Sequence, residues 1–344
     1  AYDPTFPDGY DLNNPYELSA KDKKKIKSTP KKKQAEAESA ALSNMWRNKA
    51  VADTYMPGSV FKMCVASAAL EENLVNEKTS FTCTGSISVE GETIHCSNIS
   101  GHGTQNFVEA ISNSCNPAFI QIGQMLGAGK FRQYYQGFGF SDKTGIDLPG
   151  EAEDSFWKEG KMGGVDLAVA SFGQNFTITP IQMITACAAV SNGGYVVQPH
   201  VVSKITDSKG NVIKSVDKKI KRQVISDDTS KKMNEYLEYN TERQGAAAGY
   251  ISGYKVAGKT GTTEKRGVTK VESSFSEDYI SSFCGYAPAD DPQIAMLVFF
   301  DTPDGDAYYG SQVSSPVFIN IMSEVLPYLD VKKSDVAMSF LRKT

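Results

Sequence analysis

The sequence predicts an α/β chain of the α+β type, with a largely helical middle and an antiparallel sheet near its end. Residues 107–128 and 177–192 repeat apolar side chains at helical spacing. Three later stretches have strand-like composition and are separated by turn-forming residues. Hydrophobic residues make up 40% of the 344 residues and charged residues 22%, so we expect a sizeable core and exclude a disordered or fibrous chain.

Charge and hydropathy exclude two further classes. The net charge is −4, whereas general nucleic-acid binders need a basic footprint, so we expect no nucleic acid partner. The longest apolar run, residues 294–300, is far shorter than the ~20 residues that cross a bilayer. Because the chain starts abruptly at Ala1, we expect an anchor or leader upstream of it.

The first 45 residues contain a lysine-rich stretch with little apolar periodicity. Eight lysines lie between Lys21 and Lys33, and such runs usually face water. We therefore expect a flexible, solvated loop or a frayed segment here. The alternative is a patch that binds an anionic polymer or a lipid headgroup.

The next elements follow from turn residues and apolar spacing. A mostly buried helix is expected to start near Ser59, directly after a Pro-Gly pair. Short strands and turns are predicted over 79–104, a turn at 208–211 and a polar helix over 227–243. Three strands and a helix that covers them are predicted to close the chain, at 254–259, 279–286, 293–300 and 316–329.

A serine and a lysine three residues apart on a helix form the first candidate catalytic pair. They share a helix face, and burial disfavours the charged amine, so a neutral lysine can accept the serine proton. Only Ser59 with Lys62 opens an apolar helix, whereas four other copies lie in charged, loop or strand contexts, at Ser28, Ser155, Ser215 and Ser252. A helix N-terminus also offers backbone amides to an oxyanion. The alternative interpretation of Ser59 is a simple helix N-cap.

Two further motifs support a catalytic interpretation. Ser114-Cys115-Asn116 is the only Ser-x-Asn in the chain, and Lys-Thr-Gly occurs at residues 143–145 and again at 259–261. The second copy follows a strand-like stretch and continues into Thr262. A strand edge with these residues, and a glycine that lets backbone approach a ligand, can bind a carboxylate-terminated peptide. We therefore favour the second copy.

In this order the three motifs resemble those of penicillin-binding proteins and serine β-lactamases. The similarity runs from about residue 45 to residue 329 and divides the chain into a truncated domain start at 1–45, a transpeptidase domain at 46–330 and a tail or linker at 331–344. Longer strings are similar to class B penicillin-binding proteins of the Gram-positive division and sporulation type, namely Tyr55-Met-Pro-Gly-Ser-Val-Phe-Lys62, Gly101-His-Gly-Thr104, Gly145-Ile-Asp-Leu-Pro-Gly-Glu151, Thr179-Pro-Ile-Gln182 and Val256-Ala-Gly-Lys-Thr-Gly-Thr262.

The resemblance implies a fold, an activity and a set of residue roles. The implied fold is an antiparallel sheet flanked by helices and joined to a helical lobe, with the cleft between them. The implied activity is D,D-transpeptidation, which cross-links peptidoglycan stem peptides through a serine acyl-enzyme that β-lactams also form. In the acyl transfer, Ser59 would be the nucleophile, Lys62 would be the base and Ser114 would relay protons. Asn116 would bind the substrate amide, Lys259 would supply positive charge, and Thr260 and Thr262, beside Gly261, would bind the terminal carboxylate. The backbone amides of Ser59 and Thr262 would form the oxyanion hole.

The resemblance also implies parts that lie upstream of this chain. The family's sheet begins with two strands just before a segment like residues 1–14, and without them the remaining strands have an exposed edge. We therefore expect a missing N-terminal stretch, with a membrane anchor and pedestal, on the extracytoplasmic face of the bacterial membrane. A glycosyltransferase of the division or sporulation machinery is the expected partner.

Four residues near the second motif form a candidate metal site. Cys83, Cys96, His102 and Cys115 lie in one short interval, and three thiolates with one imidazole suit a tetrahedral, structural Zn²⁺. The alternatives are a disulfide between Cys83 and Cys96 and free thiols. His95 should point to the other side of its strand. The remaining cysteines lie in apolar patterns and should be inert, at positions Cys64, Cys187 and Cys284.

Related activities stay open at this stage. A β-lactamase needs a group that activates water, for which Glu151 and Glu153 are the candidates. A D,D-carboxypeptidase differs only in the acceptor that it admits, and a β-lactam-binding sensor would acylate once and signal. A fluorescent penicillin separates these activities, because rapid turnover indicates a β-lactamase and a persistent adduct a transpeptidase or a sensor.

Overall fold

The computed structural model describes residues 16–152, 156–265, 279–303 and 305–334. Its main sheet has three antiparallel strands in the order β11–β10–β9, which span Ile294–Asp301, Tyr279–Ala287 and Ala257–Glu264. The predicted hairpin between the last two strands is confirmed. The first strand was placed three residues too early, because Ile251 and Tyr254 bridge across a turn at Gly253, whose φ is +83°. Ser252 therefore lies in a turn and not at a strand start.

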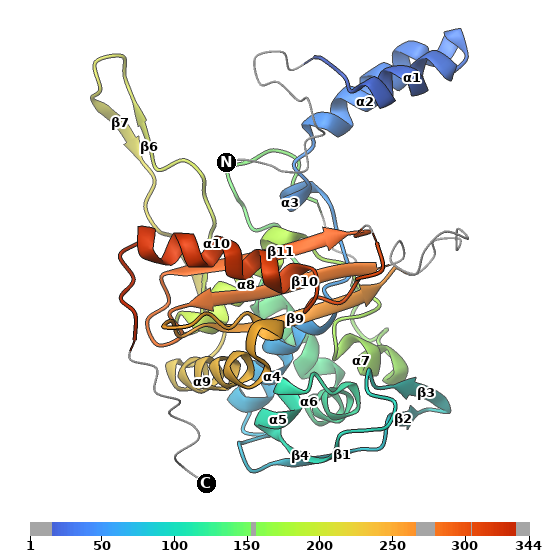
Figure 1. The fold of residues 1–344 in the computed structure, drawn as a ribbon, viewed down its shortest axis with the longest axis vertical. Helices are drawn as coiled ribbons and strands as arrows, with labels where there is room; N and C mark the ends of the chain where they lie inside the picture. Colours follow the sequence, from blue (N-terminus) through green and yellow to red (C-terminus); the bar gives the residue numbers. More distant parts are fainter. Residues whose placement is uncertain (1–15, 153–155, 266–278, 304, 335–344) are drawn as a thin grey trace.

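Helices cover both faces of this sheet (Figure 1). Helix α10 (Ser314–Tyr328) packs on one face, where Phe283 and Phe318 belong to one hydrophobic cluster. Helices α8 (Pro180–Ser191) and α9 (Asp227–Gln244) contact the same strands from the other side, in the cluster that contains Cys284 and Tyr286. Because neighbouring strand residues point to opposite faces, β10 contributes alternate side chains to the two clusters.

The helical lobe is built around α4 (Lys62–Glu71), in which nine of ten residues are buried. A helix that is buried on all sides belongs at the centre of a helical layer. The 3₁₀ turn η2 (Gly58–Phe61) precedes α4, and its Phe61 ring packs among four other aromatic rings. Helix α4 packs against α6 (Asn116–Gly137), and α5 (Phe107–Ser112) and α7 (Gly164–Ala170) complete the lobe, α7 by packing on α6. The predicted arrangement of a sheet, flanking helices and a helical lobe is therefore confirmed.

Outside the main sheet and the helical lobe, the described residues form four short two-stranded sheets. The strands predicted over 79–104 are present as two pairs beside the lobe, β1 (Ser80–Cys83) with β4 (Gly103–Asn106) and β2 (Ser86–Val89) with β3 (Glu92–His95). The other two pairs are β5 (Tyr195–Val197) with β8 (Ile220–Gln223) and β6 (Lys204–Thr206) with β7 (Val212–Ser215). The β6–β7 hairpin projects from the body in Figure 1.

The lysine-rich stretch is helical, so the expectation of a loop was wrong. It forms α1 (Ala20–Ser28), η1 (Lys31–Lys33) and α2 (Gln34–Trp46), and α3 (Lys49–Ala52) follows. Ser19 caps α1 by accepting a hydrogen bond from the Asp22 N–H at 3.1 Å, and lysine is a good helix former. The helices α1 and α2 project from the body as one arm (Figure 1). Residues 1–15 of the predicted segment and 335–344 of the predicted tail lie outside the described residues.

Candidate active site

The side chain of Lys62 joins the first two motifs. Its Nζ donates hydrogen bonds to Ser114 O at 2.7 Å, to Ser114 Oγ at 3.2 Å and to Asn116 Oδ1 at 2.7 Å. Only 1% of Lys62 is exposed. Three polar atoms within hydrogen-bond distance of Nζ hold the amine in one position.

The surroundings of Lys62 disfavour its charged form. Burial lowers the pKa of Lys62 well below its ordinary value, and the nearby charge of Lys259 lowers this pKa further. The rings of Phe119 and Phe172, with their centroids 5.3 Å and 6.0 Å from Nζ, act in the opposite direction because aromatic faces attract a cation, but burial has the larger effect on this pKa. A neutral amine can accept a proton, so the environment suits Lys62 to act as a general base.

Ser59 lies one 3₁₀ turn before Lys62, and the α-helix predicted from Ser59 begins only at Lys62. Ser59 is half-buried, and the Lys62 N–H donates to its carbonyl. In a 3₁₀ turn, side chains at i and i+3 eclipse one another, so the hydroxyl and the amine leave the same side of the turn. The Gly58 N–H donates to Gly173 O at 2.8 Å, which fixes the start of the turn.

Strand β9 packs against this turn and carries the third motif. Lys259 is 1% exposed, its Nζ donates to Thr260 O at 3.1 Å, and burial lowers its pKa to about 7. Thr260 and Thr262 are half-buried and alternate with the buried Lys259 and Gly261. A Cβ on Gly261 would lie 2.4 Å from Ser282 Oγ and 3.3 Å from Pro57 O, so a glycine permits the close approach of strand and turn.

A second glycine contacts the strand from the segment before α10, and the sequence motifs did not point to it. The Gly310 N–H donates to Thr262 Oγ1 at 3.0 Å. A Cβ on Gly310 would lie 2.4 Å from Gly261 O. In the same segment, the ring of Tyr308 stacks on that of Tyr279 at the start of β10, with centroids 4.4 Å apart. Within the described part of the chain, β9 is an edge strand, so its outer backbone can pair with an extended peptide.

Ser114 sits at a sharp break between α5 and α6. Its φ is +51°, in the left-handed region that costs energy for a residue with a side chain. This conformation directs both its carbonyl and its hydroxyl to Lys62. Asn116 begins α6, and its Nδ2 donates to His95 O at 3.2 Å. The second motif is therefore fixed from both the helix side and the β3 side.

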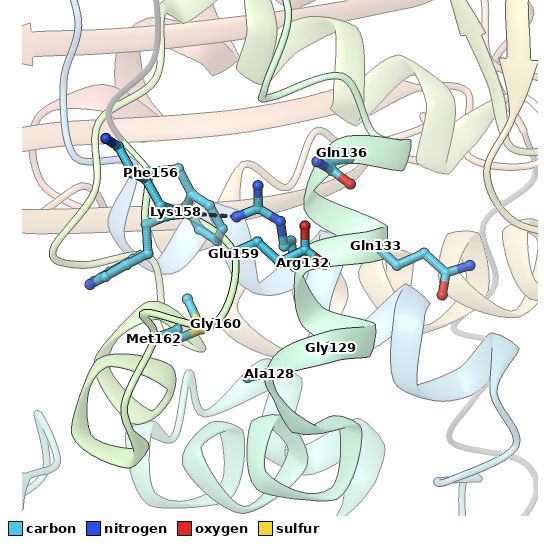
Figure 2. Close-up of a pocket in the computed structure, with 11 residues that line it drawn as sticks. Ala128, Gly129, Arg132, Gln133, Gln136, Phe156, Lys158, Glu159, Gly160 and Met162 are labelled. Carbon is cyan, nitrogen blue, oxygen red and sulfur yellow. Dashed lines mark hydrogen bonds between the residues drawn. The ribbon is translucent and has the colours of Figure 1, made fainter.

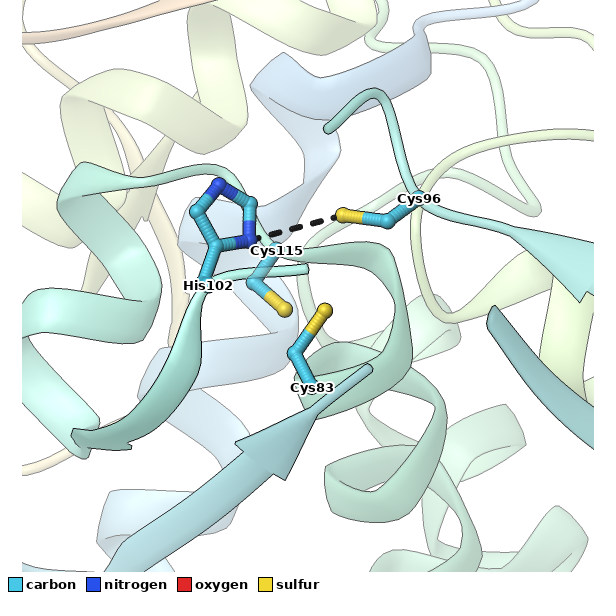
Figure 3. A group of neighbouring side chains, drawn as sticks. All are labelled: Cys83, Cys96, His102 and Cys115. Atoms are coloured by element: carbon cyan, nitrogen blue, oxygen red, sulfur yellow. Dashed lines mark hydrogen bonds between the residues drawn. The ribbon is translucent and has the colours of Figure 1, made fainter. Parts of the chain in front are cut away.

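The side chains of the four candidate metal ligands converge on one another (Figure 3), and one of them, Cys115, directly follows Ser114 in the chain. The ligand atoms of Cys83, Cys96, His102 and Cys115 all lie within 4.8 Å of one another, and Cys96 Sγ is 3.6 Å from His102 Nδ1. Bonds of ~2.3 Å to a tetrahedral Zn²⁺ separate two sulfurs by roughly 3.8 Å, so the group has the dimensions of a metal site. His95 is exposed and outside the group, as expected.

The cysteines of the cluster and those of the core differ in the pKa of their thiols. All six cysteines are free thiols, so the alternative disulfide between Cys83 and Cys96 is not formed. A hydrogen bond with Cys115 lowers the pKa of the Cys96 thiol to about 4, and the same contact raises the pKa of Cys115. A thiolate is the metal-binding form of cysteine. Burial raises the pKa of Cys64 and of Cys284 in the core, which supports the expectation that they are inert.

Comparison with known proteins identifies the family. The profile described as "Penicillin binding protein transpeptidase domain" matches residues 17–323. The chain belongs to this family. Stage V sporulation protein D of Bacillus subtilis is 39% identical over 288 residues, which cover 83% of this chain and 44% of that protein. Peptidoglycan D,D-transpeptidase MrdA of Acinetobacter baumannii is 31% identical over 293 residues, 79% of this chain and 43% of that protein.

Solved structures agree with the family assignment. The transpeptidase domain of Burkholderia pseudomallei penicillin-binding protein 3 superimposes with a TM-score of 0.73 at 26% identity, covering 84% of this chain and 83% of that one. The family predicted from the three motifs is confirmed. The chain spans less than half the length of the curated relatives named above. No helix among the described residues is long and apolar enough to cross a membrane.

The remaining candidate residues from the sequence of this penicillin-binding protein domain are not part of the three-motif site. The Glu151 carboxylate accepts hydrogen bonds from Thr144 and from the Gly145 N–H, so it ties down the loop with the other Lys-Thr-Gly copy. Glu153 and Ser155 lie outside the described residues. A cavity of about 440 Å³ opens between α6 and residues 156–162 (Figure 2), but none of the three motifs lines it.

Proposed function

We propose that this chain is the catalytic part of a peptidoglycan D,D-transpeptidase that β-lactams acylate. The observation that carries the proposal is the buried amine of Lys62, held by Ser114 and Asn116 and lying one 3₁₀ turn after Ser59. A relative with 31% identity is named a peptidoglycan D,D-transpeptidase. The relative with 39% identity is named Stage V sporulation protein D, which favours a role in sporulation, and the division machinery is the alternative.

The proposed reaction has two acyl transfers. Ser59 Oγ attacks the carbonyl of the penultimate D-Ala as Lys62 accepts the hydroxyl proton, and the amides of Ser59 and Thr262 bind the oxyanion. The peptide C–N bond then breaks, and the proton returns through Ser114 to the leaving D-Ala amine. A second stem peptide's amine attacks the ester, and its proton passes back to Ser59 when the new amide forms. Asn116 holds the substrate amide, whereas Lys259, Thr260 and Thr262 bind the terminal carboxylate beside Gly261.

Substrate chemistry determines the proposed location and partners. Peptidoglycan stem peptides lie outside the bacterial cytoplasmic membrane, so we place the domain on the extracytoplasmic face, held by an anchor that precedes it. A glycosyltransferase that makes the glycan strands is the proposed partner in the division or sporulation machinery. We retain residues 46–330 as the transpeptidase domain and 331–344 as a tail or linker.

The four-residue cluster is proposed to hold a structural Zn²⁺. Cys83, Cys96, His102 and Cys115 supply three sulfurs and one imidazole, and their ligand atoms lie close enough for one tetrahedral ion. When bound, the ion would cross-link β1, the end of β3, the start of β4 and the start of α6. All four positions are then protein ligands, so the acyl transfer uses none of its coordination sites.

Labelling with a fluorescent penicillin tests the catalytic proposal. We expect a persistent adduct that maps to Ser59 by mass spectrometry and disappears in Ser59→Ala. The matched control is Ser252→Ala, which removes an exposed serine that also precedes a lysine by three residues and should label normally. Labelling of Ser59→Ala would reject the nucleophile, and rapid hydrolysis of the adduct would favour a β-lactamase.

A further inference from the structure

Within the arm of α1, η1 and α2, the segment of α1 and η1 is the most basic surface of the described chain. Residues 21–33 carry eight lysines and one aspartate, a net charge of +7, so the rest of the chain carries −11. All eight lysines are exposed. Such charge separation gives the molecule a strong dipole, whose positive end is this arm.

The positive charges of these lysines have almost no acidic partners within the described chain. Of the eight lysines, only Lys23 forms an ion pair with a described residue, Glu17, at 3.1 Å, and both side chains are half exposed. Surface pairs of this kind contribute little. In α1 the pairs Lys21–Lys25 and Lys23–Lys27 stand four residues apart, where like charges repel and destabilise a helix. An external anion that bridges these ammonium groups would therefore stabilise α1.

The distribution of lysines around α1 favours a flexible linear polyanion over a flat anionic membrane surface. At 100° per residue the lysines of α1 spread over about 200° of its circumference, which a flexible chain can follow better than a flat surface. Ile26 is the only apolar residue of α1 larger than alanine, so the helix has no apolar face to insert into a lipid interface. We propose that this arm binds a linear polyanion with regularly spaced phosphates, and that it does so independently of the acyl-transfer site.

Binding of long-chain inorganic polyphosphate tests the proposal. We expect the affinity to fall steeply with salt, with a log–log slope of about −3 to −5 for five to seven contacts. Replacing Lys24, Lys25, Lys27 and Lys31 with glutamine should weaken binding at least about 10²-fold. The matched control makes the same change in net charge at four exposed lysines on or beside the β6–β7 hairpin, Lys204, Lys209, Lys214 and Lys218, and should weaken binding less than about threefold.

Two further measurements separate the outcomes. Hydrogen exchange should slow over Ala20–Ser28 when polyphosphate binds, because the bridged lysines no longer repel. Both quadruple variants should keep the thermal stability and penicillin labelling of the parent chain. Equal loss of affinity in both variants, protection elsewhere in the chain, or tighter binding to phosphatidylglycerol vesicles than to polyphosphate would overturn the proposal.

Discussion

At the scale of single residues, Ser114 combines a backbone cost with a polar contact to Lys62. Ser114→Ala removes the 3.2 Å hydrogen bond to Nζ but keeps a Cβ at φ +51°. We expect penicillin acylation to slow by about 10- to 100-fold, because the variant loses both a contact that holds Nζ and the proposed proton relay to the leaving group. Ser114→Gly should slow acylation equally yet unfold in urea with a free energy about 1 kcal/mol larger than that of Ser114→Ala. Equal stability of the two variants would contradict the strain.

Lys259 predicts a pH dependence that depends on the substrate. Burial lowers the pKa of Lys259 to about 7, so the amine is cationic below that pH and neutral above it. Attraction for a terminal carboxylate is present on the acid side and is lost as the pH rises through about 7. We expect kcat/KM for a carboxylate substrate, divided by kcat/KM for its carboxamide analogue, to fall above this pH. Lys62 serves both substrates and cancels in the ratio, so a flat ratio would refute the role of Lys259.

At the scale of elements, the distance between strand β9 and its neighbours depends on Gly310. A methyl group there would lie 2.4 Å from Gly261 O and 2.5 Å from Ser282 O, and both obstacles are backbone atoms. Gly310→Ala should therefore cost at least about 2 kcal/mol of unfolding free energy and slow acylation, because β9 must move. Gly129→Ala is the control, since its Cβ meets nothing within 4 Å. That helical substitution should stabilise by roughly 0.5–1 kcal/mol and leave acylation unchanged.

These elements also show which features a sequence can predict. Apolar spacing predicted α8 and α10, and the composition of the last strands predicted the hairpin, because burial on one face imposes those patterns locally. Helix α1 was missed because the charge pattern outweighed lysine's helix propensity and the Ser19 cap. The family resemblance placed Lys62 and Ser114 in one site, and in the structure their side chains lie within hydrogen-bond distance. The contact of Gly310 with Thr262 joins residues 48 positions apart, and no local pattern records such a contact.

At the scale of the whole molecule, we propose that the candidate metal cluster of Cys83, Cys96, His102 and Cys115 couples the stability of the lobe to the chemistry of the active site. Cys115 lies between Ser114 and Asn116, both of which hold Lys62, while Cys83 comes from β1 outside the motifs. If zinc fixes Cys115, its removal by a chelator should lower Tm by at least about 5 °C and slow acylation in parallel. Cys83→Ala should reproduce both changes and lose the metal in elemental analysis.

The core cysteine Cys187 supplies the matched control for this coupling. It is fully buried in α8 and lies outside the group of four, so Cys187→Ala should lower Tm through a small cavity yet retain one zinc per chain. Its acylation rate should remain sensitive to the chelator, whereas that of Cys83→Ala should not. A chain that contains no metal, or one that loses metal while Tm and acylation stay constant, would refute the proposed coupling between the cluster and the active site. Parallel loss of both properties only in the ligand variant would instead establish that one ion outside the reaction path holds Ser114 and Asn116 in position.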